Sequence, residues 1–162
     1  MGGNMRLTEI LTVDRILVDK AGDLVGKKSE VLAELARLLS AGSSVDPAVI
    51  EHQLVEREKL QSTGIGDGVA IPHTSVEEFS AQKAALILAP RGIEFESIDG
   101  QPASIIFGVV GPKRAASEHL KILAKVSRLL RSPETRRRLL EAASPEQAYT
   151  LIEEHEASSV TP

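Results

Sequence analysis

Residues 104–110 read Ser-Ile-Ile-Phe-Gly-Val-Val, and Gly111-Pro112 follows them. The run is apolar at consecutive positions, which predicts a strand that is buried on both faces and lies at the centre of a sheet. Weaker strand signals lie at 15–19, 69–71 and 84–88, and a short edge strand is predicted around 93–95. We therefore expect a sheet of about four to five strands built around 104–110.

Helix signals precede the strands at 69–110. Apolar residues at helical spacing predict a first helix that Ser29 caps and Gly42 ends. Asp46 and Pro47 predict the start of a second helix, which runs to about Leu60.

Three further helices are predicted after 104–110. Ser117 is the expected N-cap of the first, and Ser132-Pro133 and Ser144-Pro145 are the expected starts of the other two. The apolar face of the first is predicted from Leu120, Leu123, Ala124, Ser127, Leu129 and Leu130. This order of elements indicates the α/β (α+β) class, a three-layer α/β/α sandwich with a central mixed sheet.

The length of 162 residues predicts one domain, 1–162, with a core of about 7–154 and a flexible tail at 157–162. Aromatic residues make up 2% of the chain and the net charge is −4, so neither base stacking nor electrostatics favours nucleic acid. No apolar run approaches the roughly 20 residues of a membrane span. The absence of Cys excludes thiolate chemistry and fits a reducing compartment, so a cytoplasmic protein is expected.

The candidate functional residues are concentrated in residues 57–74, where glycines at alternate positions precede a Pro-His pair. His73 is expected just past a strand, at an edge where α/β proteins bind ligands. Gly64 and its neighbours could present backbone N–H groups to an anion, and Ser62 and Thr63 add hydroxyl donors. The spacing matches neither a Walker A loop nor a dinucleotide fingerprint.

Two further side chains would complete an anion site. The Arg57 guanidinium suits two oxygens of a phosphoryl group. His119 is predicted at the second position of a helix, where the positive helix end favours anions. A neutral imidazole beside such groups suits transfer of a phosphoryl group onto nitrogen.

Each element also has a simpler explanation. His73 could be a structural histidine, Arg57 and His119 could be solvated residues near helix ends, and the glycines could form a hairpin loop. Asp67, His73 and His119 could bind a divalent metal, but no second carboxylate stands at ligand spacing, so neither a metal nor a cofactor is expected.

Residues 57–73 follow the pattern Arg-Glu-x₃-Ser-Thr-Gly-Ile-Gly-Asp-Gly-Val-Ala-Ile-Pro-His. This pattern resembles the active-site signature of enzyme IIA of the bacterial phosphoenolpyruvate-dependent sugar phosphotransferase system, fructose/mannitol type. Blocks at 97–102 and 119–130 resemble the same family, and the likeness covers about 7–154. The sequence pattern Ser-Thr-Gly-Ile-Gly-x-Gly-x-Ala-Ile-Pro-His is most similar to that of the nitrogen-regulatory branch.

The resemblance implies a three-layer α/β/α fold and a phosphotransferase component. His73 would accept a phosphoryl group from a histidine-containing phosphocarrier protein, and Arg57 and His119 would stabilise it. The group would pass to a separate IIB component, or its presence would regulate other proteins. The chain carries neither the Cys of a IIB unit nor a membrane IIC span, so a free-standing IIA is expected.

Two residues depart from the family pattern. Thr74 stands where Gly is usual, and Asp67 stands where Asn is more usual and would place a negative charge near the phosphoryl group. The alternative hypothesis is therefore a regulatory binding module on the same fold that carries no phosphate.

Overall fold

The computed structural model describes residues 5–158. Strand β6 (Ala103–Gly111) lies inside the sheet, as its apolar sequence predicts. It pairs antiparallel with β5 (Lys83–Ile93) on one side. On the other side it pairs in parallel with β3 (Val69–Ala70) and then with β4 (His73–Ser75).

Two edge strands complete a mixed, six-stranded sheet within the described part of the chain. Strand β1 (Ile16–Val18) is parallel to β5, and β2 (Gly64–Gly66) is antiparallel to β3. The order is β1-β5-β6-β3-β2, and β4 pairs with β6. The sequence misses β2 and β4, and the separate edge strand predicted around 93–95 is wrong because Ile93 is the last residue of β5.

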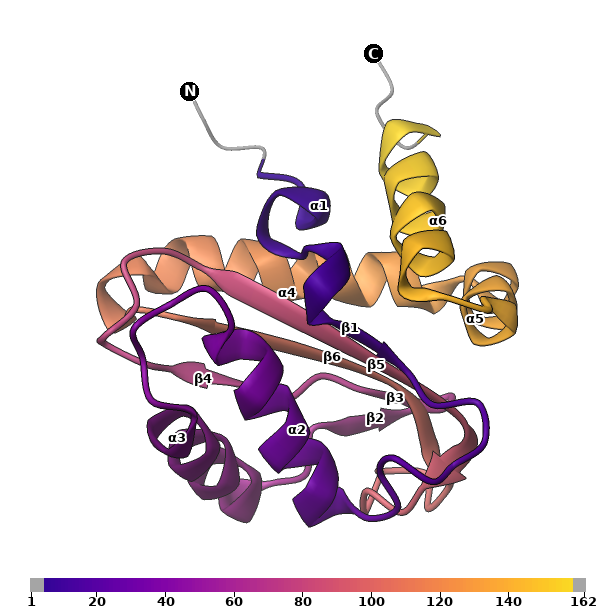
Figure 1. Ribbon diagram of the computed structural model, residues 1–162, viewed down its shortest axis with the longest axis horizontal. Helices are drawn as coiled ribbons and strands as arrows, with labels where there is room; N and C mark the ends of the chain where they lie inside the picture. The colour runs from indigo at the N-terminus through magenta and orange to yellow at the C-terminus, as the bar shows by residue number, and fades with distance from the viewer. Residues whose placement is uncertain (1–4, 159–162) are drawn as a thin grey trace.

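Helices cover both faces of this sheet (Figure 1). One face carries α2 (Lys28–Ser40) and α3 (Pro47–Leu60). The other carries α1 (Leu7–Ile10), α4 (Ala116–Arg131), α5 (Pro133–Glu141) and α6 (Pro145–Ser158). Short 3₁₀ turns, η1 (Val13–Arg15) and η2 (Lys113–Ala115), precede β1 and α4. The three-layer α/β/α sandwich is confirmed.

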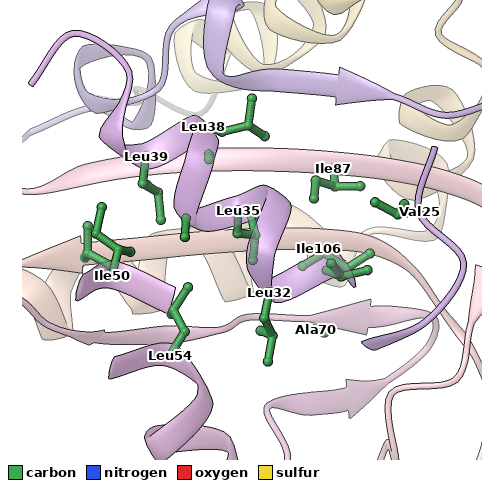
Figure 2. Close-up of a cluster of buried hydrophobic side chains, with 14 of the residues drawn as sticks. Val25, Leu32, Leu35, Leu38, Leu39, Ile50, Leu54, Ala70, Ile87 and Ile106 are labelled. Carbon is green, nitrogen blue, oxygen red and sulfur yellow. The ribbon is translucent and has the colours of Figure 1, made fainter. Parts of the chain in front are cut away.

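The alternation of side chains along the strands divides the core in two. Strand β5 directs Ile87 towards α2 and α3, and Leu86 towards the opposite helices. Figure 2 shows the first of these clusters, which includes Leu35 of α2, Leu54 of α3 and Ile106 of β6. Because both faces are covered, β6 has no wet face, and its sequence can be apolar throughout.

Several predicted helix boundaries are confirmed. Gly42 has a φ of 79°, the left-handed conformation expected after a helix end. Asp46 caps α3 by accepting a hydrogen bond from the Ala48 N–H, and Ser132 caps α5 in the same way. Ser144 accepts a hydrogen bond from the Gln147 N–H at the start of α6.

Other predictions about the helices are wrong. Helix α2 begins at Lys28 with Lys27 as its N-cap, so Ser29 lies inside the helix. Helix α4 begins at Ala116, because η2 leads directly into it and leaves no capping role for Ser117. Leu120 is 66% exposed. The buried face of α4 consists of Ile122, Val126, Leu129 and Leu130.

Helices α1 and α6, which lie near the two ends of the described residues, are hydrogen-bonded to each other. Helix α6 continues to Ser158, so the tail predicted at 157–162 begins too early, and 159–162 lie outside the described residues. The buried Glu156 carboxylate of α6 accepts hydrogen bonds from the N–H groups of Leu7 and Thr8 in α1. None of the helices in residues 5–158 has both the length and the apolar character of a membrane span.

Candidate functional site

His73 is the first residue of β4 and follows the break that Pro72 makes in pairing along β6. Its partner across the sheet is Val109, whose side chain lies among those of α4, so the imidazole is on the α4 face. His73 Nδ1 lies 2.6 Å from the carbonyl oxygen of Ile71. A carbonyl can only accept, so the neutral ring carries its proton on Nδ1 and keeps a lone pair on Nε2.

His119 meets His73 from α4. The ring centroids are 6.0 Å apart and the ring planes are inclined at 49°. His119 Nδ1 lies 2.8 Å from Oε1 of Gln82. Because α4 begins at Ala116, His119 is its fourth residue and not the second as predicted, so the field of the helix end acts on it less.

Both imidazoles are held in the neutral form. Burial lowers the pKa of His73 from its ordinary value of 6.5, the Arg57 charge lowers it further, and the Ile71 hydrogen bond and the Glu58 charge act against this. Burial and the nearby His73 lower the pKa of His119. At about pH 7 the site therefore presents two uncharged rings, each with a proton on Nδ1.

We expect both histidines to titrate below their ordinary pKa in an NMR titration of the C–H ring protons. A histidine with a depressed folded-state pKa contributes stability that is complete above its unfolded pKa of 6.5 and is lost as the pH falls through the folded value. The free energy of unfolding should therefore decrease as the pH falls below the unfolded value of 6.5. A His73 or His119 ring that titrates at or above 6.5 would contradict the burial argument.

Arg57 lies in the last turn of α3 and is half-buried. Its Nη1 donates to the carbonyl oxygen of Gln61 at 2.9 Å, which holds the side chain against the chain entering the hairpin. Within residues 5–158 it forms no ion pair with a carboxylate, and its charge acts on His73. A guanidinium in this setting retains donors for an arriving anion.

Ser62, Thr63 and Gly64 use their polar groups inside the protein. The Ser62 hydroxyl donates to the Phe95 carbonyl at 2.7 Å and accepts from the Gly64 N–H at 3.1 Å. The Thr63 hydroxyl and N–H both bond to the Glu58 carboxylate. A Cβ on Gly64 would lie 2.9 Å from Cα of Ser97, so glycine is needed for close packing there. In this geometry the three residues shape the loop.

The other glycines form a hairpin, which is one of the alternatives that the sequence left open. Asp67 and Gly68 connect β2 to β3 with φ values of 58° and 77°, as a tight turn requires. The Asp67 N–H donates to Oδ2 of Asp99. Asp67 is thus at the hairpin turn and His73 follows the opposite end of β3, so the structure does not bring Asp67 to the histidine pair.

Thr74 is next to His73 in β4, but its side chain is on the other face of the sheet. Its partner on β6 is Val110, which belongs to the core beneath α2 and α3. The Thr74 methyl and hydroxyl therefore point away from the space between the two imidazoles.

Glu58 is a site residue that the sequence reasoning missed. It is buried, and its Oε1 lies 2.9 Å from Nζ of Lys28, which also lies 4.7 Å from the centre of the Phe95 ring. The signal was present, because Ile50, Leu54 and Glu58 follow one another at four-residue spacing and place Glu58 on the buried stripe of α3. Gln82 carries no comparable signal, since it lies in a polar connection.

The sequence and the fold match those of a known family. The family model described as "Phosphoenolpyruvate-dependent sugar phosphotransferase system, EIIA 2" matches residues 9–155. The chain therefore belongs to the EIIA 2 family of the phosphotransferase system.

Similar proteins carry two kinds of name. The "Nitrogen regulatory protein" of Pseudomonas aeruginosa is 34% identical over 149 residues, which are 91% of this chain and 95% of that protein. The "PTS system fructose-specific EIIABC component" of Bacillus subtilis is 33% identical over 153 residues, which are 94% of this chain and 24% of that protein. The crystal structure of "Nitrogen Regulatory Protein IIA-Ntr" from Neisseria meningitidis has a TM-score of 0.82, 33% identity, and covers 90% of this chain and 98% of that one.

Proposed function

We propose that this chain is a phosphocarrier of the phosphotransferase system that accepts a phosphoryl group on Nε2 of His73. The observation that carries the proposal is the hydrogen bond between His73 Nδ1 and the Ile71 carbonyl, at 2.6 Å. It fixes the tautomer whose free lone pair is on Nε2, the nitrogen that is left to react. Lowering of the His73 pKa keeps that lone pair unprotonated at about pH 7.

The transfer balances without a proton leaving His73. The P–N bond to the donor's histidine breaks as a P–N bond to Nε2 of His73 forms, and the Nδ1–H stays on the Ile71 carbonyl. Positive charge then accumulates on the His73 ring while the phosphoryl oxygens are anionic. The negative charge of the phosphoryl group favours the protonated form of His119, which takes a proton from solvent on Nε2 and donates to one of these oxygens, and Arg57 supplies a permanent positive charge.

The donor we propose is a histidine-containing phosphocarrier protein. The nitrogen regulatory protein of Pseudomonas aeruginosa matches this chain along 95% of its length, against 80% for the fructose-specific EIIA component of Haloferax volcanii and 24% for the fructose-specific EIIABC component of Bacillus subtilis. We therefore favour a regulatory role in the cytoplasm, in which the phosphorylated and free forms bind other proteins differently, over transfer to a separate IIB component.

The test is incubation of the chain with phosphoenolpyruvate and its two upstream phosphotransferase proteins, followed by intact-mass spectrometry. We expect a mass increase of one phosphoryl group, lost in acid and retained in alkali, as a phosphoramidate requires. A chain that remains unphosphorylated while the upstream carrier is fully phosphorylated would contradict the proposal and favour a binding module that carries no phosphate.

A further inference from the structure

Gln82 lies between β4 and β5 and is 3% exposed. Its Oε1 is 2.8 Å from Nδ1 of His119, and its Nε2 is 3.5 Å from the carbonyl oxygen of Ala115, the N-cap of α4. The carboxamide also lies against Gly111 at the end of β6, where a Cβ would be 2.2 Å from Nε2. Gln82 is thus confined between the end of the central strand and the start of the helix that carries His119.

These contacts determine which way the amide faces. The Ala115 carbonyl can only accept, so the NH₂ group of Gln82 belongs on that side and its oxygen faces His119. The oxygen can only accept, so Nδ1 of His119 must carry a proton. Nε2 of His119 is then the nitrogen free to act towards His73, whose ring centroid is 6.0 Å away.

We propose that Gln82 is a positioning residue for phosphoryl transfer, which holds His119 in the Nδ1–H tautomer with Nε2 directed at the phosphoryl group on His73. The proposal rests on the proposed function above. The effect of Gln82 would be preorganisation, because a His119 ring held by a hydrogen bond need not be reoriented when the phosphoryl group arrives. Without an acceptor at Nδ1, either nitrogen of His119 can carry the proton and the ring can rotate.

Three variants separate the hydrogen bond from simple packing. Gln82→Met keeps the length of the side chain and removes the acceptor. Gln82→Glu keeps an acceptor and adds charge, and Gly111→Ala displaces the carboxamide through the close contact at its Cβ. Gln53→Met on α3 is the matched control, because it makes the same chemical change at an exposed position.

The first measurement is the tautomer of His119, read from long-range ¹⁵N–¹H NMR spectra of the unphosphorylated chain. We expect Nδ1–H in the wild type, the control and Gln82→Glu, and a mixture of tautomers in Gln82→Met and Gly111→Ala. The Gln82→Glu carboxylate should also raise the pKa of His119, since a nearby negative charge favours the imidazolium. Three other groups influence this titration, because His73 acts on His119, and Arg57 and Glu58 act on His73.

The second measurement is the rate of phosphoryl transfer to the chain. We expect Gln82→Met and Gly111→Ala to be about 10- to 100-fold slower than wild type, by analogy with the range found for residues that orient metal-ligating histidines. Gln82→Glu should recover most of the rate, with its optimum shifted to higher pH. The mid-point of unfolding of each variant shows that it folds.

Two results would overturn the proposal. One is a Gln82→Met protein that keeps the Nδ1–H tautomer, and the other is a shifted tautomer with an unchanged transfer rate. A wild-type chain that takes up no phosphoryl group would overturn the proposed function and the role of Gln82 in transfer together. The tautomer spectra need no donor, so they tell these failures apart.

Discussion

The His73→Ala variant is expected to take up no phosphoryl group under conditions in which the wild type is fully phosphorylated. His73 supplies the nucleophilic Nε2, and its Nδ1–H is held by Ile71. The other imidazole of the site, His119, has its ring centre 6.0 Å away and belongs to a different element. A group placed for attack at one position is not placed at the other, because transfer depends on alignment within a fraction of an ångström.

Intact-mass spectrometry is the measurement, and His119→Ala is the matched comparison. That variant retains the acceptor and should reach the same final mass, but more slowly by about 10²- to 10³-fold, the loss typical of removing one donor that stabilises developing charge. His73 is half-buried, so His73→Ala should unfold at nearly the wild-type urea concentration. An acid-labile phosphoryl group on folded His73→Ala protein would assign the acceptor elsewhere, with His119 the first position to inspect.

The fold is predictable where the sequence carries a strong apolar pattern. Strand β6 and helix α3 are found correctly because each has one uninterrupted signal and clear ends. Strand β4 is missed because its residues, His-Thr-Ser, have no apolar pattern and are held to β6 by backbone pairing alone. The start of α4 is misplaced because a 3₁₀ turn leads into it without a capping side chain.

The site is less predictable than the fold. His73, Arg57 and His119 come from three separate elements, and their residue types alone leave simpler explanations open. The structure brings the two imidazole rings together and places the Arg57 charge where it acts on His73. Local chemistry named these three residues as a candidate anion site, and the likeness to a family favoured that role over the simpler explanations.

The glycine-rich loop shows why the positions of glycines do not by themselves predict what a loop does. Glycine suits both an anion-binding loop and a tight hairpin, since both use positive φ or close approach of the backbone. Here Gly68 serves the turn and Gly64 serves packing on Ser97. The Ser62 hydroxyl is bonded to the carbonyl oxygen of Phe95, which is distant in sequence, and the Thr63 hydroxyl is bonded to the buried Glu58 carboxylate. Neither contact can be read from the sequence of the loop.

Replacement of Glu58 by alanine is expected to lower the free energy of unfolding by about 3 kcal/mol, the lower part of the range for removing one partner of a buried ion pair. The Glu58 side chain is 5% exposed and that of its partner Lys28 is 18% exposed. Without the carboxylate, Lys28 keeps the Phe95 ring and Glu96, whose side chain is 76% exposed, and the N–H of Thr63 loses its acceptor. An uncompensated ammonium in this position is costly because little water reaches it.

Urea unfolding of Glu58→Ala beside Glu56→Ala provides the measurement and its control. Glu56 lies two residues earlier on the same helix and pairs with Lys59, but both side chains are exposed, at 47% and 66%. Such a pair contributes less than about 1 kcal/mol. Equal destabilisation by the two substitutions would show that burial does not distinguish the pairs.

The double variant Lys28→Met, Glu58→Ala tests the cause of the instability. If the cost of Glu58→Ala comes from an unpaired charge, removing that charge should return part of the lost stability, and the two substitutions should be non-additive. Lys28→Met alone leaves Glu58 buried, with Thr63 as its hydrogen-bond partner within residues 5–158, and should also destabilise. Glu58 opposes the lowering of the His73 pKa, so Glu58→Ala should lower that pKa further while leaving the Nε2 lone pair available. Additive losses would instead mean that Glu58 acts through the hairpin loop and not through Lys28.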